Sequence, residues 1–321
     1  MGSIVKKWGK NMSEKKYRLV TRSDFDGLVC AILLKYLGVV DGIKFVHPKD
    51  MQDGTILITD NDITTNLPYV EGVHLAFDHH DSEITRVGRL MENYIIDTNA
   101  PSAARVVFDH YGGKSVFSNI SDDMMSAVDK SDAAMFSRQE ILQPEGWVLM
   151  NFLMDSRTGL GRFRDFRVSN YQLMMDLIEF CHDHDIDDVL GLPDVQERTK
   201  LYFEHEEKFI EQIKSSTTVH KNLAVLDLKK VDTIFAGNRF MIYALYPDTN
   251  ISIHVMWGLN ELNTVFATGK SIINRTSKTN IGELMLSYGG GGHLNAGTCQ
   301  VENEYADQVL AELIARINQD G

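Results

Sequence analysis

The stretch VHLAFDHH, residues 73–80, places three ionisable side chains directly after an apolar segment. Such side chains at the end of a buried strand cost free energy unless something binds them. A carboxylate beside two imidazoles suits a transition metal that takes both oxygen and nitrogen ligands, such as Mn, Fe, Co or Zn. A metal site is therefore the first hypothesis. An isolated Asp-His-His triplet is also compatible with a solvated strand or helix end. The choice between this interpretation and a metal site therefore depends on the other motifs of the chain.

A second acidic motif lies near the start of the chain. The predicted strand Arg18–Thr21 is followed by Ser23-Asp24-Phe25-Asp26-Gly27 and then by the predicted helix Leu28–Leu37. In extended chain the spacing of Asp24 and Asp26 points both carboxylates to one side, where they need a cation. We interpret Gly27 as the residue that lets the backbone turn sharply into the helix. A helix cap would explain one of these aspartates but not both.

Strands and helices alternate through this first half of the chain. Two further strands are predicted at Ile43–Val46 and Thr55–Thr59, and the second ends at Asp60-Asn61-Asp62. This alternation indicates an α/β fold with a parallel sheet, in which ligands gather beyond the carboxyl ends of the strands. We therefore expect the strand-terminal groups to converge on one edge of the sheet. These groups are Asp24, Asp26, Asp60, Asp78, His79 and His80.

Helical segments follow the last of these strands. The helix Ser102–Tyr111 is predicted to stop at Gly112-Gly113, because glycine favours the end of a helix. The next helical stretch, Asp122–Val128, runs into Asp129-Lys130-Ser131-Asp132. This places another acid at an element boundary, and we choose Asp132 over Asp129 as the candidate ligand.

The second half of the chain reads as a separate, smaller domain. Residues Gln196–Lys214 are strongly charged with a helical period and no wide apolar face, which is typical of a connecting helix. We expect a first domain over residues 12–195, a linker helix over 196–218 and a mixed α/β domain over 219–321; residues 1–11 are left out of the fold. The elements predicted in the second domain are the strands Leu223–Leu228, Arg239–Tyr246, Ile251–Trp257, Thr264–Ala267 and Gly297–Val301, and the helix Ile281–Tyr288.

The second domain contains the run Gly289-Gly290-Gly291-Gly292-His293. Consecutive glycines allow backbone N–H groups to turn together and bind an anion, and they let a phosphate approach without a Cβ in the way. His293 would add a donor. A flexible linker is the alternative, but this run lies between a predicted helix and a predicted strand, so phosphate binding is favoured.

Composition limits the kinds of partner. The formal net charge of −13 argues against binding of long duplex nucleic acid, which needs many Lys and Arg side chains. A small anionic substrate is still compatible, because divalent cations would reverse the local potential. The 3 cysteines are far apart and form no Cys-x-x-Cys pair, which fits a reducing cytoplasm. No apolar run is long enough to span a membrane, so no membrane partner is expected.

Together, Asp24-Phe25-Asp26-Gly27, Asp60, Asp78-His79-His80, Asp132 and the glycine run resemble the DHH phosphoesterase superfamily, in its DHH–DHHA1 branch. This branch includes RecJ-like exonucleases and the nano-RNase and pAp-phosphatase group. The resemblance extends from Tyr17 to Val301, with the motifs in the family's order. It implies a catalytic DHH domain, a substrate-binding DHHA1 domain and a cleft between them.

The resemblance also implies roles for individual residues. Asp24 and Asp26 would each hold one of two divalent cations, most often Mn²⁺ with Mg²⁺ or Co²⁺ as alternatives. Asp60 would bridge the two ions, and His79 and Asp132 would complete the second site. Asp78 would orient an imidazole, while His80 would face the scissile phosphate and stabilise charge or protonate the leaving oxygen. The implied contacts to substrate phosphate are Arg275, Gly290, Gly291, Gly292 and His293.

The chain departs from the commonest family pattern in one place. Many members carry a histidine shortly before the Asp-x-Asp pair, where this chain has Val20 and Arg22. RecJ-type members also lack this histidine, so activity is still expected.

The function implied is two-metal hydrolysis of a short nucleotide such as the linear dinucleotide pGpG or nano-RNA, because no long basic surface is present. The alternatives are a pAp phosphatase, a polyphosphate or pyrophosphate hydrolase, and a nucleotide-binding regulatory protein with a degenerate site. A homodimer is left open.

Overall fold

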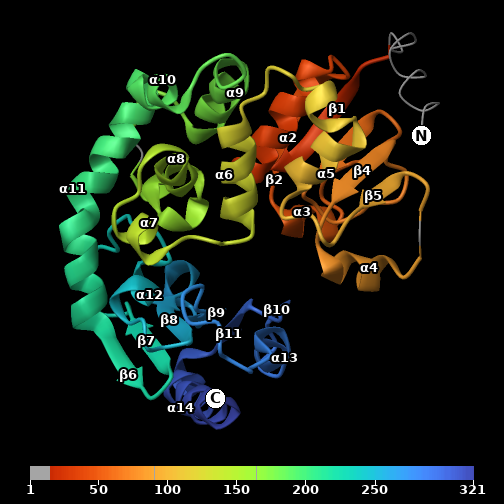
Figure 1. The fold of residues 1–321 in the computed structure, drawn as a ribbon. Coiled ribbons are helices and arrows are strands. Elements are labelled where there is room, and N and C mark those ends of the chain that lie inside the picture. The colour runs from red at the N-terminus through yellow and green to blue at the C-terminus, as the bar shows by residue number, and fades with distance from the viewer. Residues whose placement is uncertain (1–14, 90, 164) are drawn as a thin grey trace. The chain divides into compact units, whose positions relative to one another are not determined.

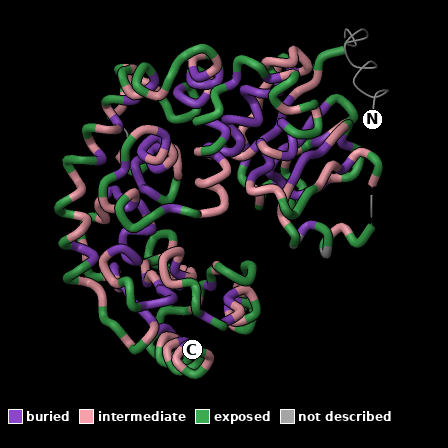
Figure 2. Tube along the Cα trace, in the orientation of Figure 1, coloured by how far each residue is buried: buried purple, intermediate pink, exposed green. Residues whose placement is uncertain are grey.

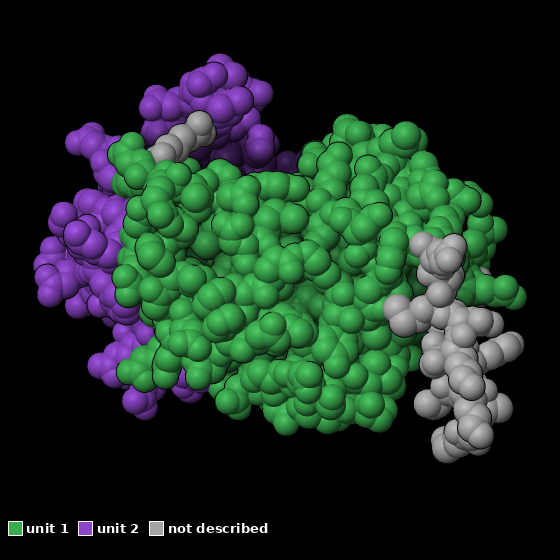
Figure 3. Space-filling view, turned by 90° about the horizontal axis from the view of Figure 1, so that it is seen from above, with its two compact units in different colours: residues 1–135, 145–156, 161–199 green, residues 136–144, 157–160, 200–321 purple. Residues whose placement is uncertain are grey.

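The structure is a computed structural model that describes residues 15–89, 91–163 and 165–321, so the segment 1–11 set aside above lies outside the described residues. The chain forms two compact units (Figure 3). The first contains residues up to 135 together with 145–156 and 161–199. The second contains 136–144, 157–160 and 200–321. Each unit is described by itself.

The first unit is built on a parallel five-stranded sheet with the strand order β2-β1-β3-β4-β5 (Figure 1). This confirms the α/β class and the parallel sheet predicted from the alternation of strands and helices. Because every strand runs in the same direction, all carboxyl ends lie at one edge. The strands are β1 (Tyr17–Arg22), β2 (Val40–Val46), β3 (Asp62–Thr65), β4 (Leu75–Asp78) and β5 (Tyr94–Ile96).

Helix α2 (Phe25–Tyr36) forms the centre of this unit. It is buried from Phe25 to Leu34 (Figure 2) and contacts β1, β2, α5, α6 and α9, which explains why it is apolar on every side. Its burial fixes the position of the acidic motif at its start. The other helices of the unit are α3 (Pro48–Gln52), α4 (Asp81–Val87), α5 (Ala103–His110), α6 (Asp122–Asp132), α8 (Gly146–Met154), α9 (Asn170–Phe180) and α10 (Ile186–Gly191).

The third strand is not where the sequence predicted it. Residues 55–59 form no strand, and β3 begins at Asp62 instead. The Asp62 carboxylate explains the difference, since it accepts hydrogen bonds from the Thr59 backbone N–H at 2.7 Å and from Arg18 Nε at 2.6 Å. These bonds hold residues 59–62 in a turn and leave the following residues to pair with β1. The strand prediction over Thr55–Thr59 is therefore wrong.

The second unit contains a six-stranded mixed sheet with the order β10-β11-β9-β8-β7-β6. Only β7 and β8 pair in parallel; the other neighbouring pairs are antiparallel. Helices α13 and α14 supply apolar side chains, including Met285, Leu313 and Ile317, to the same core as Ile253 and Phe266 of the sheet. The elements are β6 (Thr217–His220), β7 (Leu223–Asp227), β8 (Ile251–Trp257), β9 (Thr264–Lys270), β10 (Gly291–His293), β11 (Ala296–Val301), α7 (Arg138–Leu142), α12 (Met241–Leu245), α13 (Ile281–Leu286) and α14 (Ala306–Asp320).

One strand predicted in the second unit is a helix. Residues 239–246 were expected to be extended, but α12 occupies Met241–Leu245, so the prediction is wrong. The side chain of Asn238 turns the chain there, because its Oδ1 accepts from the Phe240 backbone N–H at 3.2 Å. Residues 240–244 are buried, and a short apolar run of this kind has no period that separates strand from helix.

A long helix connects the two units. Helix α11 covers Pro193–Ser216, which is slightly longer than the predicted span. The segments 136–144 and 157–160 belong to the second unit, although the sequence placed them in the first domain. No helix in the described part of the chain is long and apolar enough to cross a membrane. The cysteines Cys30, Cys181 and Cys299 are buried free thiols.

Candidate metal centre

Asp24 begins the buried helix α2 and acts as its N-cap. Its Oδ1 accepts from the Gly27 backbone N–H at 3.0 Å, and its Oδ2 pairs with Arg22 Nε at 2.8 Å. Arg22 lies in the segment where many family members have a histidine, so here a guanidinium accompanies the first aspartate. Asp24 therefore combines a helix cap with a position at the carboxyl end of β1.

Gly27 has a different role from the predicted one. It lies inside the first turn of α2, and a Cβ at this position would be only 1.9 Å from the Arg22 carbonyl oxygen. The glycine is therefore needed because the helix approaches the end of β1 closely. The sharp turn itself occurs at Ser23 and Asp24, before the helix begins.

Asp26, in the first turn of α2, is buried against the start of helix α5. Its carboxylate oxygens accept from the backbone N–H groups of Ala103 at 3.0 Å and Ala104 at 2.7 Å. Burial, together with the negative charge of Asp132, raises the pKa of Asp26 to about 8. The free energy of ionising this group is therefore high unless a cation is bound nearby.

His79 and Asp132 lie directly beside Asp26. His79 Nε2 is 2.8 Å from Asp132 Oδ2, and its Nδ1 is 3.2 Å from the Ala100 carbonyl oxygen. Burial opposes a charge on His79, but the hydrogen bond to Asp132 and the charge of Asp132 outweigh it and raise the pKa of His79 to about 9. One ligand atom from each of Asp26, His79 and Asp132 falls within 4.8 Å of the others, a spacing that could hold a metal ion.

Asp129 has a different set of partners. Its carboxylate accepts from Ser102 Oγ at 2.7 Å and from Arg105 at 2.6 Å. Asp129 therefore ties α6 to the start of α5, while Asp132, three residues later, extends to His79. Asp132, and not Asp129, therefore lies beside His79, and its role as a metal ligand stays a prediction.

The buried carboxylate of Asp78 orients the ring of His80 through a hydrogen bond. At the end of β4, its Oδ1 accepts from His80 Nδ1 at 2.7 Å, and its Oδ2 accepts from the Tyr94 hydroxyl at 3.0 Å. The hydrogen bond at Nδ1 fixes the ring and leaves Nε2 for other contacts. The His80 side chain is 42% exposed, so that second nitrogen is accessible. Asp78 is thus in the position expected of a group that orients an imidazole.

Asp60 does not join this cluster. It is exposed and precedes β3, and the next residue, Asn61, accepts a backbone hydrogen bond from Arg18 near the start of β1. Asp60 therefore lies at the amino-terminal edge of the sheet, whereas Asp24 and Asp78 lie at the carboxyl-terminal edge. The expectation that Asp60 lies at the carboxyl edge depended on a strand that ends at Asp60, and residues 55–59 form no strand. The bridging role that the family resemblance implies stays a prediction.

Asn66 occupies the place after β3 that the sequence analysis gave to Asp60. It is 2% exposed, and its Nδ2 donates to Asp24 Oδ1 at 3.4 Å. Asn66 is absent from the residues predicted from the sequence, because the third strand was predicted a few residues too early. The run Asp62-Ile63-Thr64-Thr65 has the β-branched residues that favour a strand, but residues 55–59 have them as well, so this signal does not select the strand.

The predicted phosphate contacts all lie in the second unit. Gly291–His293 forms the edge strand β10, which pairs with β11, so the glycine run is part of a hairpin. Gly290 has to lack a side chain for the hairpin to pack, because a Cβ on Gly290 would be 2.2 Å from the Thr298 carbonyl oxygen. Arg275 and His293 are both exposed. Binding of a phosphate by these residues stays a prediction.

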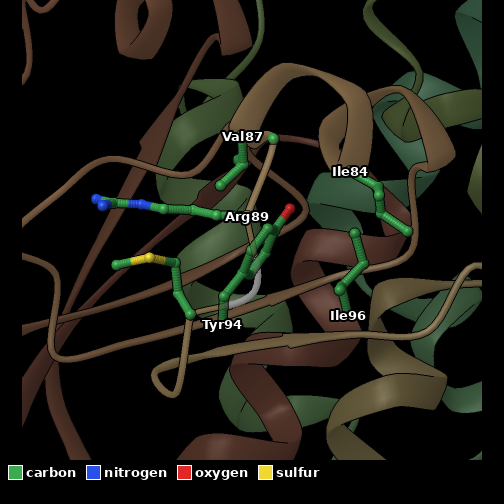
Figure 4. A pocket seen from close by; sticks show the side chains of 7 residues that line it. Ile84, Val87, Arg89, Tyr94 and Ile96 are labelled. Carbon is green, nitrogen blue, oxygen red and sulfur yellow. The ribbon is translucent and has the colours of Figure 1, made fainter.

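An apolar hollow of about 260 Å³ lies between α4 and β5 of the first unit (Figure 4). Its wall includes the ring of Tyr94, whose hydroxyl bonds Asp78. The side chain of Tyr94 therefore contacts both the hollow and Asp78. The lining residues are Ile84, Val87, Gly88, Arg89, Met91, Tyr94 and Ile96.

The donors that gather at this edge suit divalent cations. Carboxylates and imidazole are ligands that Mn²⁺ and similar ions accept, and a cation would offset the repulsion between Asp26 and Asp132. A parallel α/β sheet with such a cluster at its carboxyl edge, joined by a helix to a second mixed unit, defines the class of two-domain phosphoesterases expected from the motifs.

Comparison with known proteins agrees with this class. The chain is similar to the pGpG-specific phosphodiesterase PggH from Vibrio cholerae, with 60% sequence identity, a TM-score of 0.84 and coverage of 95% of this chain and 100% of that one. It also resembles the fold of RecJ from Thermus thermophilus, solved with Mn²⁺, at 12% identity and a TM-score of 0.53, covering 98% of this chain and 54% of RecJ. No protein-family model and no curated protein sequence matches. The chain therefore belongs to the DHH–DHHA1 phosphoesterase superfamily.

Proposed function

We propose that this protein is a metal-dependent phosphodiesterase that hydrolyses short linear dinucleotides, with pGpG as the leading substrate, to mononucleotides. The observation that carries this proposal is the 60% identity to the pGpG-specific phosphodiesterase over 95% of the chain. The cluster at the carboxyl edge of the first sheet supports the same chemistry. Short nucleotides fit the net charge of −13, which disfavours long duplex nucleic acid.

The cofactor proposed is a pair of divalent cations, Mn²⁺ on the grounds of ligand chemistry, with Mg²⁺ or Co²⁺ as alternatives. Asp24, Asp26, His79 and Asp132 would hold them. Two such ions in a hydrolase supply a hydroxide nucleophile at neutral pH and neutralise charge on the phosphoryl oxygens. The grouping of two carboxylates with an imidazole, Asp26, Asp132 and His79, is the feature that suits this cofactor.

His80 is proposed to act on the leaving oxygen. Its Nδ1 donates to Asp78, so the proton available for transfer is carried on Nε2. Burial opposes the protonated form, but the hydrogen bond to Asp78 and the charge of Asp78 raise the pKa of His80. The imidazole is therefore held in the form that can stabilise the developing charge or donate a proton.

Residues of the second unit are proposed to bind the substrate's terminal phosphate or nucleotide. Arg275 and His293 are exposed and offer donors suited to a phosphate. Gly290, Gly291 and Gly292 precede His293 on the same edge segment. These contacts would select the length of the substrate, while the first unit carries the chemistry.

A substrate panel tests the proposal. The purified protein is incubated with Mn²⁺ and, separately, with pGpG, longer oligoribonucleotides, pAp, polyphosphate and pyrophosphate, and products are separated by chromatography. We expect GMP from pGpG, loss of this activity with EDTA, and recovery on adding Mn²⁺. If the protein hydrolysed only pAp or only polyphosphate, that compound and not a dinucleotide would be its substrate. Binding of nucleotide and metal without any turnover would instead support a regulatory nucleotide-binding protein.

The cellular setting is part of the same proposal. A cytoplasmic location fits the buried free thiols of Cys30, Cys181 and Cys299, which need a reducing compartment to stay reduced. A homodimer is left open, and size-exclusion chromatography with light scattering measures it directly.

A further inference from the structure

Three strands of the second sheet place polar side chains at one end of that sheet. Asn222 directly precedes β7, Asn250 directly precedes β8 and Ser271 directly follows β9. Because β7 runs parallel to β8 and β9 runs antiparallel to it, the start of β7, the start of β8 and the end of β9 lie side by side. These three polar residues are therefore neighbours, although the sequence separates them.

The glycine hairpin lies at the same end of the sheet. At the end of β9 the Lys270 backbone N–H donates to the Asn295 carbonyl oxygen at 2.9 Å, in the turn between β10 and β11. His293 is the last residue of β10, just before this turn. The segment 271–276, which contains Arg275, leaves the sheet at this end as well. The two side chains proposed to bind phosphate, Arg275 and His293, thus belong to one end of the sheet.

Asn250 connects the sheet to the segment 271–276. The residue is 5% exposed, so its amide is buried. Its Oδ1 accepts from Asn222 Nδ2 at 2.9 Å, and its Nδ2 donates to Thr276 Oγ1 at 3.0 Å. Its backbone carbonyl oxygen accepts from the Ser271 N–H at 2.9 Å. A buried amide that is bonded at both ends has one orientation, so Asn250 fixes the residue after Arg275 relative to the sheet.

The segment forms a turn that has Arg275 at its tip. The Thr276 hydroxyl donates to Asn274 Oδ1 at 2.7 Å, so the residues on either side of Arg275 are bonded to each other. Ser271 Oγ accepts from the Asn274 backbone N–H at 3.0 Å. Arg275 itself is exposed, and its Nε donates to the Ile272 carbonyl oxygen at 3.1 Å. The guanidinium is therefore presented to solvent by a turn whose two sides are fixed.

We infer that Asn250 is a positioning residue, whose buried amide holds the turn 271–276 and so places the Arg275 guanidinium for the substrate's phosphate. This inference rests on the proposed role of Arg275 and adds the residue that orients it. A misplaced guanidinium loses the parallel hydrogen bonds that make arginine a strong phosphate ligand. Losing Asn250 should therefore weaken phosphate binding without altering the proposed metal centre, whose residues lie in the first unit.

Substitutions at both ends of the Asn250–Thr276 bond test the inference. Asn250→Ala removes the amide, and Thr276→Val removes the hydroxyl but keeps the branched shape, whereas Thr276→Ser keeps the hydroxyl. KM and kcat are measured with Mn²⁺ for pGpG and for GpG, which lacks the 5′-phosphate. We expect Asn250→Ala and Thr276→Val to raise KM for pGpG by about twofold to tenfold, the range for one hydrogen bond, with little change in kcat. Thr276→Ser should match the unsubstituted protein, and GpG should show a smaller rise.

A double substitution shows whether Asn250 acts through Arg275. If it does, Asn250→Ala should have no further effect on KM for pGpG once Arg275→Ala has removed the guanidinium. If the two residues contribute independently, their effects on KM should multiply. Isothermal titration calorimetry with pGpG in the presence of EDTA makes the same comparison as a binding affinity, without any turnover.

Asn238→Ala is the matched control. Asn238 is another buried amide of the second unit, and its Nδ2 donates to the Ile141 carbonyl oxygen at 3.1 Å and to the Tyr202 hydroxyl oxygen at 3.0 Å. Both partners lie outside the turn 271–276. Asn238→Ala and Asn250→Ala should both lower the thermal midpoint, but only Asn250→Ala should raise KM for pGpG. This difference separates positioning from a loss of stability.

Two results would overturn the positioning role: an unchanged KM in both Asn250→Ala and Thr276→Val, or an effect of Asn250→Ala that stays undiminished in the Arg275→Ala background. If Asn250→Ala does not fold, the comparison of Thr276→Val with Thr276→Ser decides, and equal KM values count against the inference. If the unsubstituted protein cleaves no dinucleotide, the affinity for pGpG in EDTA decides. An affinity that depends on Asn250 through Arg275 would retain the positioning role and reject the reaction, whereas no binding of pGpG would reject both.

Discussion

Asp78 Oδ1 accepts a hydrogen bond from His80 Nδ1 at 2.7 Å, and this pair links a fully buried carboxylate to a half-exposed imidazole at the edge of the sheet. The pairing fixes the ring through Nδ1 and leaves Nε2 for other contacts. Asp26, His79 and Asp132 offer ligand atoms within 4.8 Å of one another. The proposed orientation of His80 and the proposed binding of metal therefore involve different side chains, and mutations can separate them.

His80→Ala should retain metal and lose turnover. The substitution removes the group proposed to protonate the leaving oxygen, an effect of about a hundredfold or more in kcat for general acid catalysis. Mn²⁺ content is measured by mass spectrometry of the metal and kcat by release of GMP from pGpG. His182→Ala is the control, because His182 pairs with Asp183 in another part of the unit. A loss of bound Mn²⁺ in His80→Ala would make His80 a ligand instead.

Asp60→Ala and Asp132→Ala should behave differently, although the motif analysis made both residues ligands. Asp132 lies 2.8 Å from His79 in the cluster, while Asp60 is exposed before β3. We expect Asp132→Ala to lower Mn²⁺ affinity and activity by tenfold or more, and Asp60→Ala to leave both within about twofold. Calorimetric titration with Mn²⁺ compares them. Loss of metal in Asp60→Ala would restore the bridging role and would mean that the third strand is misplaced.

Tyr94→Phe should reduce both stability and turnover. Its hydroxyl donates to buried Asp78 Oδ2 at 3.0 Å, and removing it leaves that oxygen without this donor, which costs about 1–3 kcal/mol. Urea unfolding gives the free energy, and steady-state kinetics gives kcat.

Tyr69→Phe is the matched comparison for Tyr94→Phe. The two rings pack at a centroid distance of 4.9 Å, but the Tyr69 hydroxyl donates to Asn93. This variant should lose stability while kcat stays near that of the unsubstituted protein. Equal kcat values in the two variants would show that the hydrogen bond from Tyr94 to Asp78 does not affect turnover.

Removing His293 should raise KM for a dinucleotide that carries a 5′-phosphate. If His293 binds that phosphate, the loss is that of a hydrogen bond to a charged group, about 1.5–3 kcal/mol or on the order of tenfold to a hundredfold in kcat/KM. His293→Ala should keep its full metal content, since His293 lies in the second unit. A dinucleotide without the 5′-phosphate should show a smaller loss. An equal loss for both substrates would point to a role at the scissile phosphate.

The second unit should become less stable as the pH falls below neutrality. Burial, together with the positive charge of Arg239, lowers the pKa of His254 from 6.5 to about 4. Between these two values the unfolded chain binds a proton at this position that the folded chain does not. Stability contributed by neutral His254 is therefore full above pH 6.5 and falls by roughly 1 kcal/mol per pH unit towards pH 4.

His254→Gln tests this pH dependence, because glutamine keeps polarity but does not titrate. Urea unfolding is followed at several pH values from 7 to 4, and the difference in unfolding free energy between the two proteins is plotted. As the pH falls, the unfolding free energy of the unsubstituted protein should decrease more than that of His254→Gln. A difference that is constant with pH would exclude His254 as the source.

The sequence alone determined the parallel sheet of the first unit, its acidic edge and the family. Strands followed directly by Asp24 and by Asp78-His79-His80 are local patterns, and the parallel direction of the strands then brings these groups together. Strand β8 also has the predicted bounds, Ile251–Trp257, because Asn250 and Gly258 flank its β-branched and aromatic residues.

Tertiary structure alone decided which segment forms the third strand. Residues 55–59 and 62–65 both have the composition of a strand, so local propensity cannot choose between them. The choice is made by distant partners: Arg18 binds the Asp62 carboxylate, and Asp62 in turn holds the Thr59 N–H. This shift moves Asp60 to the opposite edge and brings Asn66 beside Asp24. The residue that lies beside Asp24 thus depends on strand register, which long-range contacts fix.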